Sequence, residues 1–241
     1  MDDCFYIGSC RYLTLFDKKF GAFLYSTREI LNFLTATYHK NMQMNSLAWY
    51  GINMRRHIHD NVLKYIHNKC ESGCTTLVME ISTFKVLYKN KICMIHGKVV
   101  VCGRHDTPIN VDQFHAEVRR KLASVVTLTP DEVVADLIKI EQLAKLCGYA
   151  KCFIIPHVNL PSRKNNGELI PQRNLLCKTL ADAAATSAFY TYVDIAAGLQ
   201  DKYPVIENVM EDAQHWNAGA DHEHILAAVK DILVNKINQQ S

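Results

Sequence analysis

The sequence has no long uninterrupted apolar run. Its apolar stretches, such as 152–156 and 225–229, are far shorter than the roughly 20 residues that a membrane-spanning helix needs. The opening residues Met1–Cys4 are acidic, whereas a secretory signal opens on basic residues. We therefore expect a soluble, cytoplasmic protein with no transmembrane segment and no secretory signal.

An excess of charge of one sign is also lacking. The chain has 27 basic and 24 acidic residues spread along its length, which leaves a formal net charge of +3. A protein that binds nucleic acid or an anionic membrane through its charge carries a basic patch or stripe. The charge balance therefore predicts no nucleic-acid or membrane partner and favours a small-molecule ligand.

Paired cysteines of the zinc-site type are missing. The nine cysteines are odd in number, and Cys70 and Cys74 are the only close pair. A disulfide framework uses an even set, and a zinc site uses a second pair of ligands. We therefore expect reduced, ordinary thiols, as in a cytosol-like compartment.

Closely spaced histidines do not supply a metal site either. His57 and His59 are two residues apart, as are His222 and His224. On a helix, residues two apart point in different directions, so neither pair is a natural chelate. We expect surface histidines, no metal and no cofactor.

Strand-like and helix-like segments alternate along the whole chain. Buried-strand patterns occur at 4–7, 76–79, 152–156 and 191–195, and helical patterns at 26–37, 53–68, 129–148, 171–185 and 225–233. Residues 84–101 fit either an inserted hairpin or an irregular segment. With 49% hydrophobic residues, the 241 residues suffice for one core. We expect a single domain over 1–241, with about 84–115 as a candidate insertion.

Two helix starts carry specific capping signals. Ser26 or Thr27 can cap the first helix, and Ser26 with Glu29 matches the Ser-x-x-Glu capping box. Thr129 can cap a later helix whose first position is Pro130, a residue suited to that place. The acidic pair that follows complements the exposed N–H groups of the first turn.

The alternation of apolar strands and helices indicates a parallel sheet covered by helices on both faces. Ligands of such sheets bind at the carboxyl ends of the strands. The predicted strands end at Gly8, Glu80 and Pro156. Functional side chains are therefore expected at those three ends.

A turn of small residues follows the first strand, with Gly8, Ser9 and Cys10 followed by Arg11. Glycine permits the tight turn. A Ser or Cys there lies at a helix N-terminus, where N–H groups lower a thiol pKa from about 8.5 and can hold an oxyanion. Such turns are common in α/β proteins, so the motif alone favours a structural role. Arg11 fits either substrate charge or local structure.

An Asp-x-x-His motif, Asp212 with His215, precedes the terminal helix. In one loop, the histidine can act as a general base and the aspartate can fix its tautomer. The pair is unspecific by itself, because Asp221 and His224 repeat the spacing nine residues later.

Together and in this order, the two motifs resemble the SGNH (GDSL-like) hydrolase superfamily over most of the chain. In that family the first strand ends in Gly-Asp-Ser, and a late loop reads Asp-x-x-His-Pro-Asn-x-x-Gly. Asp212, His215, Asn217 and, one position early, Gly219 look like that loop, with Trp216 in place of proline. The resemblance implies a flavodoxin-like, three-layer α/β/α sandwich with a mainly parallel central sheet.

The first motif departs from the family at the nucleophile. Alignment on the glycine places Cys10, not Ser9, at the family's catalytic position, as in the Gly-Ser-Cys and Gly-Asn-Cys branches. A thiolate is intrinsically the better nucleophile, so Cys10 is favoured. Ser9 is the second candidate, and the absence of any nucleophile is the third.

The family's second and third blocks, which donate oxyanion contacts from a glycine and an asparagine, have no clear equivalents. Glu80, Ile81 and Ser82 resemble a Glu-Ile-Ser-Ser variant of the third block. That resemblance implies Ser82 as a substitute donor. Glu80 fits an ordinary strand-end acid equally well.

The third strand end carries further candidate substrate-binding residues. His157, Asn159 and Arg163 follow the strand, and Arg173 lies at the next helix start. The two arginines could hold an anionic group through paired hydrogen bonds. A solvated loop is favoured over that role, and His157 is expected to be satisfied locally.

These features favour an esterase or acyltransferase that acts on a small O-acyl ester, such as an acylated carbohydrate, through an acyl-enzyme on Cys10 or Ser9. His215 would take the nucleophile's proton, Asp212 would orient it, and the Cys10 N–H with Ser82 would hold the oxyanion. The alternative, favoured by the degraded blocks, is an inactive SGNH-like domain that binds carbohydrate or a protein partner.

Overall fold

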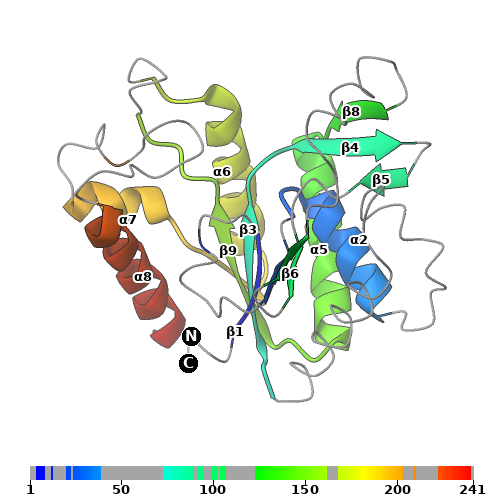
Figure 1. The fold of residues 1–241 in the computed structure, drawn as a ribbon, viewed down its shortest axis with the longest axis horizontal. Coiled ribbons are helices and arrows are strands. Elements are labelled where there is room, and N and C mark those ends of the chain that lie inside the picture. The colour runs from blue at the N-terminus through cyan, green and yellow to red at the C-terminus, as the bar shows by residue number, and fades with distance from the viewer. Residues whose placement is uncertain are drawn as a thin grey trace.

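A mainly parallel sheet with helices on both faces organises the chain in its computed structural model (Figure 1). The structure describes residues 4–8, 12, 20–22, 24–38, 73–89, 92–94, 99–101, 104–106, 123–161, 168–202, 209 and 222–239. Predictions that fall elsewhere, such as the helix over 53–68, lie outside the described residues.

Four parallel strands form the centre of the sheet. They lie in the order β10 (Tyr190–Tyr192), β9 (Lys151–Pro156), β3 (Thr76–Ile81) and β1 (Cys4–Ile7). On the far side of β1, β2 (Phe20–Ala22) adds a fifth parallel strand through the pair Ile7 and Ala22. Numbered along the chain, these five strands lie in the order 2-1-3-4-5, one of the common doubly wound orders.

The remaining described strands are antiparallel. β6 (Val99–Val101) and β7 (Arg104–Asp106) extend the central sheet beyond β2. β4 (Lys85–Lys89) and β5 (Ile92–Met94) form a hairpin, and β8 (Ala123–Thr127) pairs with the other edge of β4 in a separate small sheet. Of the two interpretations of 84–101, the structure shows the hairpin.

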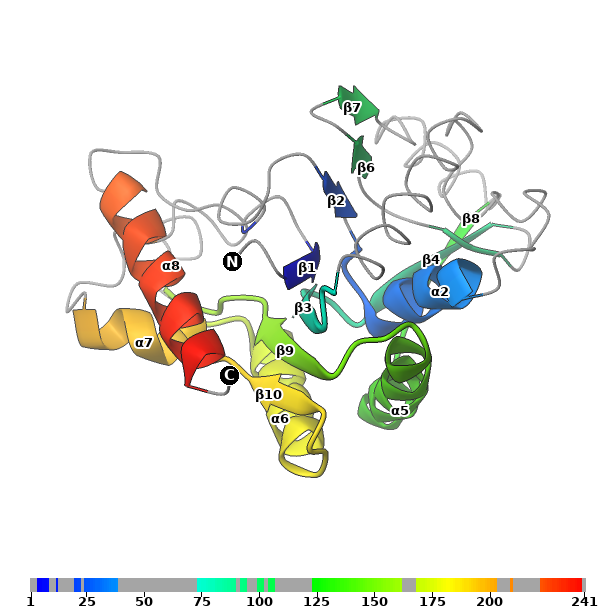
Figure 2. The same cartoon turned by 90° about the horizontal axis from the view of Figure 1, so that it is seen from below.

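The two faces of the central sheet are covered by different helices. These are α2 (Thr27–Tyr38), α5 (Pro130–Leu146) and α6 (Pro171–Ala185) on one face, and α7 (Ile195–Lys202) and α8 (His222–Asn238) on the other. Figure 2 shows α7 and α8 on the opposite side of β1, β3 and β9 from α2 and α5. This three-layer arrangement confirms the predicted α/β class with its mainly parallel sheet.

Alternate residues of each central strand supply two separate cores. In β1, Phe5 and Ile7 pack with the α2, α5 and α6 side, whereas Tyr6 packs with the α7 and α8 side. β9 behaves in the same way, with Ile154 in the first core and Phe153 in the second. Strands buried on both faces need apolar residues at every position, which is why they are continuous apolar runs in the sequence.

The predicted capping box at Ser26 is present, and the predicted cap at Thr129 is also part of a capping box. The N–H of Ser26 donates to the Glu29 carboxylate at 3.0 Å, and the N–H of Glu29 donates to the Ser26 hydroxyl at 3.3 Å. At α5, the N–H of Glu132 donates to the Thr129 hydroxyl at 3.2 Å, and the N–H of Thr129 donates back to Glu132 at 2.8 Å. Two of the N–H groups left open by each helix start are satisfied in this way.

Two strand predictions need correction at their ends. β3 continues to Ile81, one residue past the predicted end at Glu80, because Glu80 and Ile81 pair with Ile155 and Pro156 of β9. The predicted strand over 191–195 was wrong at its end, since β10 stops at Tyr192 and Ile195 begins α7. The N–H of Ala197 donates to the Asp194 side chain at 2.9 Å, a helix cap that the sequence analysis missed.

Candidate functional site

The parallel register brings the ends of β1, β3 and β9 to one edge of the sheet. Ile7 pairs with Met79, and the next residue of β3, Glu80, pairs with Ile155 of β9. Gly8 follows the end of β1, Ser82 follows the end of β3, and His157 follows the end of β9. The residues that the sequence predicted at three separate strand ends therefore meet at one edge, where parallel sheets bind ligands.

Glu80 lies at the centre of this edge and is fully buried. Its Oε2 accepts a hydrogen bond from the Tyr6 hydroxyl at 2.9 Å, and its Oε1 accepts one from the Ser82 hydroxyl at 3.2 Å. A carboxylate that is buried away from water needs such donors, because burying it without them costs roughly several kcal/mol. Glu80 is thus held within the protein, in a place suited to orienting other groups.

His157 faces the same carboxylate from β9. Its Nδ1 lies 3.9 Å from Glu80 Oε1, and the residue is only 5% exposed. Its backbone N–H donates to the Ile81 carbonyl at 3.0 Å, which continues the β3–β9 ladder and fixes the residue's position. The separation of 3.9 Å is longer than a hydrogen bond, so the carboxyl group lies beside the imidazole without bonding Nδ1 through Oε1. The expectation of a locally satisfied histidine stays a prediction.

Gly8 touches the same cluster from β1. A Cβ built at Gly8 would clash with the Tyr6 hydroxyl and would come within 2.6 Å of the Glu80 Cβ. Only glycine has room at this position. The backbone of Gly8, at the end of β1, therefore packs directly against Glu80. Ser9 and Cys10 are the next two residues in the sequence.

Ser82 has both of its donors engaged inside the protein. Its hydroxyl donates to Glu80, and its N–H donates to the Tyr25 carbonyl at 2.8 Å. In this arrangement it supports Glu80. The oxyanion role that the family resemblance implies for Ser82 stays a prediction.

Asn159 and Arg173 hold the segment after β9 against the start of α6. Asn159 Nδ2 donates to the Ile170 carbonyl at 3.1 Å and to Asn174 Oδ1 at 2.6 Å, and Asn159 Oδ1 accepts the Ile170 N–H at 3.0 Å. Arg173 donates to the Val158 carbonyl at 3.4 Å. These contacts give both residues a positioning role, and substrate binding by either stays a prediction.

A pocket of about 140 Å³ opens beside His157, between the ends of β9 and β10. Its lining combines the apolar residues Pro156, Val158, Ile195 and Ala196 with polar side chains, namely those of His157, Asn159, Asn174, Cys177, Tyr192 and Asp194. The sequence analysis missed the last four of these. It continued the final strand to Ile195, which hid Tyr192 and Asp194, and it considered only Arg173 at the start of α6. Their common signal is a position at the end of β10, just after it, or in the first turns of α6.

Burial keeps two of the pocket's ionisable groups neutral. Loss of hydration raises the pKa of the Cys177 thiol, and a hydrogen bond with Tyr192 only partly opposes this rise. Loss of hydration also raises the pKa of the Tyr192 phenol, and the negative charge of Asp194 and the hydrogen bond with Cys177 add to the effect. A neutral thiol is a poor nucleophile, so Cys177 is not suited to the role predicted for Cys10.

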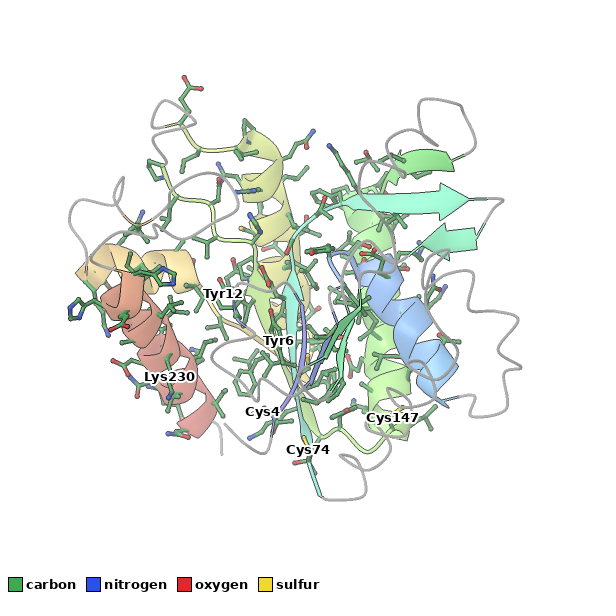
Figure 3. All side chains as sticks on the ribbon, viewed as in Figure 1. Cys4, Tyr6, Tyr12, Cys74, Cys147 and Lys230 are labelled. Carbon is green, nitrogen blue, oxygen red and sulfur yellow. The ribbon has the colours of Figure 1, made fainter. Side chains whose placement is uncertain are left out.

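The remaining predicted site residues, Ser9, Cys10, Arg11, Asp212 and His215, lie outside the described residues. The structure does place a neighbour of each motif. Tyr12, two residues after Cys10, and Val209, three residues before Asp212, are both buried in the core beneath α7 and α8. Figure 3 shows Tyr12 on the α8 side of the sheet, together with Tyr6.

Within the ranges that the structure describes, no group of three or more His, Cys, Asp or Glu side chains could hold a metal ion. None of the described helices is both long enough and apolar enough to cross a membrane.

Comparison with protein-family models, with curated proteins and with solved structures found no match to this chain.

Proposed function

We propose that the chain is an SGNH-type esterase or acyltransferase that transfers the acyl group of a small O-acyl ester through Cys10 or Ser9. His215 takes the proton of the nucleophile, and Asp212 orients that histidine. The N–H of Cys10, with Ser82 as a further donor, holds the oxyanion of the tetrahedral intermediate.

The observation that carries the proposal is the position of Gly8. It ends a central parallel strand against the buried Glu80, and the next two residues are the candidate nucleophiles. A nucleophile directly after a central strand lies at the ligand-binding edge of a doubly wound sheet. The sheet order is compatible with the family's flavodoxin-like architecture.

The shared core of Tyr12 and Val209 supports the second half of the proposal. Both residues belong to one buried cluster, although 197 positions separate them in the sequence. Chains extend by about 3.3–3.6 Å per residue, so two or three residues on either side span only about 10 Å. The described residues nearest to the two motifs therefore belong to the same core.

The alternative function is an inactive SGNH-like domain that binds carbohydrate or a protein partner. The engaged donors of Ser82 favour it, because a hydroxyl committed to Glu80 is not directed at an oxyanion. Under this alternative, the residues at the strand ends only stabilise the fold.

Covalent labelling distinguishes the two functions. An activated nucleophile reacts with iodoacetamide at Cys10, or with a fluorophosphonate at Ser9, at least about tenfold faster than an ordinary thiol or hydroxyl. The half-exposed Cys147 is the internal reference thiol. Peptide mapping after short exposures gives each rate.

The same experiment includes Cys10→Ala, Ser9→Ala and His215→Asn. The proposal expects a burst of one p-nitrophenolate per chain from p-nitrophenyl acetate, abolished by one of the first two changes and strongly slowed by the third. Slow, uniform labelling together with no burst would overturn the proposed acyl-enzyme.

A further inference from the structure

His157 connects two parts of the site. Its Nδ1 faces Glu80, which lies against Gly8, and the same residue lines the pocket between the ends of β9 and β10. Neighbouring strands lie about 4.8 Å apart, so the ends of β1 and β9, separated only by β3, are about 10 Å apart. His157 thus contacts Glu80 and also lines the pocket.

The charge of the pocket indicates what it can bind. Cys177 and Tyr192 stay neutral because burial raises both pKa values. Asn174 contributes an amide, and Asp194 contributes a carboxylate, which disfavours anions. Arg173, the nearby cation, donates to the Val158 carbonyl instead of lining the pocket. Together with the apolar residues Pro156, Val158, Ile195 and Ala196, these groups suit a neutral ligand that carries both hydroxyl groups and an apolar face.

The volume limits the ligand's size. The pocket's volume of about 140 Å³ is close to that of cavities of roughly 150 Å³ that hold one benzene molecule. It therefore has room for about one six-membered ring. A single sugar ring meets both the size limit and the preference for neutral hydroxyl groups.

We propose that this pocket binds the hydroxyl-bearing acceptor of the acyl group, a neutral compound with one sugar-sized ring, and that His157 takes the proton of its attacking hydroxyl. Glu80 is the positioning residue behind His157. This inference rests on the proposed acyl transfer and deepens it, because it makes the chain a transferase with a defined acceptor.

The step balances without any further reactant. The acceptor oxygen forms a bond to the carbonyl carbon of the acyl-enzyme, and the bond from that carbon to the Cys10 sulfur or Ser9 oxygen breaks. The hydroxyl proton passes to His157 and from there to the released thiolate or alkoxide. The products are the acylated acceptor and the free enzyme.

The test measures acylation and transfer separately. The burst of p-nitrophenolate from p-nitrophenyl acetate reports acylation, and formation of acetylated methyl glucoside, added as the acceptor, reports transfer. The central variant is His157→Asn, whose amide replaces Nδ1 opposite Glu80 and removes the rest of the ring. The matched control is His224→Asn, at an exposed position in the first turn of α8.

We expect the His157→Asn variant to keep the burst and to lose roughly 100-fold or more in transfer, the usual scale of general-base catalysis. The His224→Asn variant should match the wild type in both. Unchanged transfer in His157→Asn overturns the inference and leaves the acyl-enzyme intact. A burst lost together with transfer overturns the inference too, because His157 would then be needed for acylation itself. If the acetyl group is transferred only to water and not to methyl glucoside, the proposed class of acceptor is wrong.

Two further measurements keep the inference testable if His157→Asn does not fold, or if no acyl-enzyme forms. Methyl glucoside should shift the NMR signals of the Asn174 amide and of Tyr192 in the wild-type chain. Tyr192→Phe should raise the acceptor KM several-fold with little change in kcat. If the NMR shifts are absent, the proposed binding of the acceptor in the pocket is wrong. If the shifts are present but the burst is missing, only the proposed acyl-enzyme is wrong.

The positioning role of Glu80 has its own readout. Nitrogen-15 shifts of the His157 ring report which nitrogen carries the proton. Glu80→Gln should change the tautomer populations and reduce transfer about tenfold while the burst persists. Unchanged ring shifts and unchanged transfer in Glu80→Gln would show that Glu80 serves stability alone.

Discussion

At Gly8, one methyl group decides whether Tyr6 and Glu80 can keep their hydrogen bond. We predict that Gly8→Ala lowers the free energy of unfolding by about 1–3 kcal/mol, because the new Cβ overlaps both side chains. Urea unfolding measures the loss. The chain after β1 is then displaced as well, so labelling at Cys10 or Ser9 should slow.

Tyr6→Phe provides the matched control for Gly8→Ala. Removal of the Tyr6 hydroxyl relieves the shortest overlap but leaves the approach to the Glu80 Cβ at 2.6 Å. The double variant should therefore lose less stability than the sum of the two single variants. Strict additivity would show that the Gly8 Cβ does not meet the Tyr6 hydroxyl.

At the scale of the helix, the start of α5 makes a pH-dependent contribution to stability. The N–H of Thr129 donates to the Glu132 carboxylate, which lowers the pKa of Glu132 from its ordinary value of 4.5. The contribution is therefore complete above pH 4.5 and is lost as the pH falls through the lower, folded-state pKa.

We predict that Glu132→Gln reduces stability at neutral pH and that this difference from the wild type shrinks on acidification below pH 4.5. Urea unfolding across a pH series measures it. Asp131→Asn, in the same first turn, is the comparison variant because the capping box does not include Asp131. An Asp131→Asn profile identical to that of Glu132→Gln would contradict the assignment to the capping box.

Between helices, a buried ion pair joins α2 to α5. Arg28 Nε donates to both Asp136 oxygens at 2.9 Å, and the Thr27 hydroxyl donates to the same carboxylate at 3.1 Å. Asp136 is 1% exposed, whereas the Arg28 side chain keeps 27% of its surface. The change Asp136→Asn removes the negative charge beside the partly buried guanidinium and leaves one acceptor oxygen where two accepted from Arg28 and Thr27.

We predict that Asp136→Asn costs about 2–4 kcal/mol of stability, somewhat below the loss for a fully buried pair because Arg28 retains solvent. Asp231→Asn is the control, since the Lys202 and Asp231 side chains are both exposed, with 3.5 Å between their charged atoms. Its cost should stay below about 0.5 kcal/mol. Similar urea midpoints for both variants would refute the prediction.

The boundary between β10 and α7 shows why some elements escape prediction at this scale. Thr191, Tyr192 and Val193 favour a strand, and Ile195 extends the same apolar pattern. The chain nevertheless turns at Asp194, whose side chain caps α7. The capping boxes at Ser26 and Thr129 were predictable because both partners lie within four residues. Where β10 stops depends on its pairing with β9, which ends at Tyr192.

For the whole molecule, Cys152 can report global unfolding. It is fully buried in β9, and the loss of hydration raises the pKa of its thiol. Alkylation of Cys152 should require opening of the central sheet, so its rate should follow the equilibrium between folded and unfolded chains.

We predict that iodoacetamide modifies the half-exposed Cys147 under native conditions and modifies Cys152 only in step with urea unfolding. Mass spectrometry of the peptides gives both rates. Equal native rates at the two thiols would show that β9 opens locally, in conflict with its position between β3 and β10.

The sequence by itself determined the α/β class, the helices with local caps and the three strand ends where polar residues collect. Local hydrogen bonding and apolar periodicity decide these features, and both act over a few residues. It also determined the candidate nucleophiles after β1, since they follow a glycine at the end of an apolar run.

Only the tertiary structure decided which strand ends meet. The contact between Glu80 and His157 joins residues 77 positions apart, and it depends on β3 pairing in register with β9. The pocket likewise depends on where β10 ends and on how α6 packs beside it. Sequence spacing contains no such information, because strand order and register follow from burying both faces of the sheet at once.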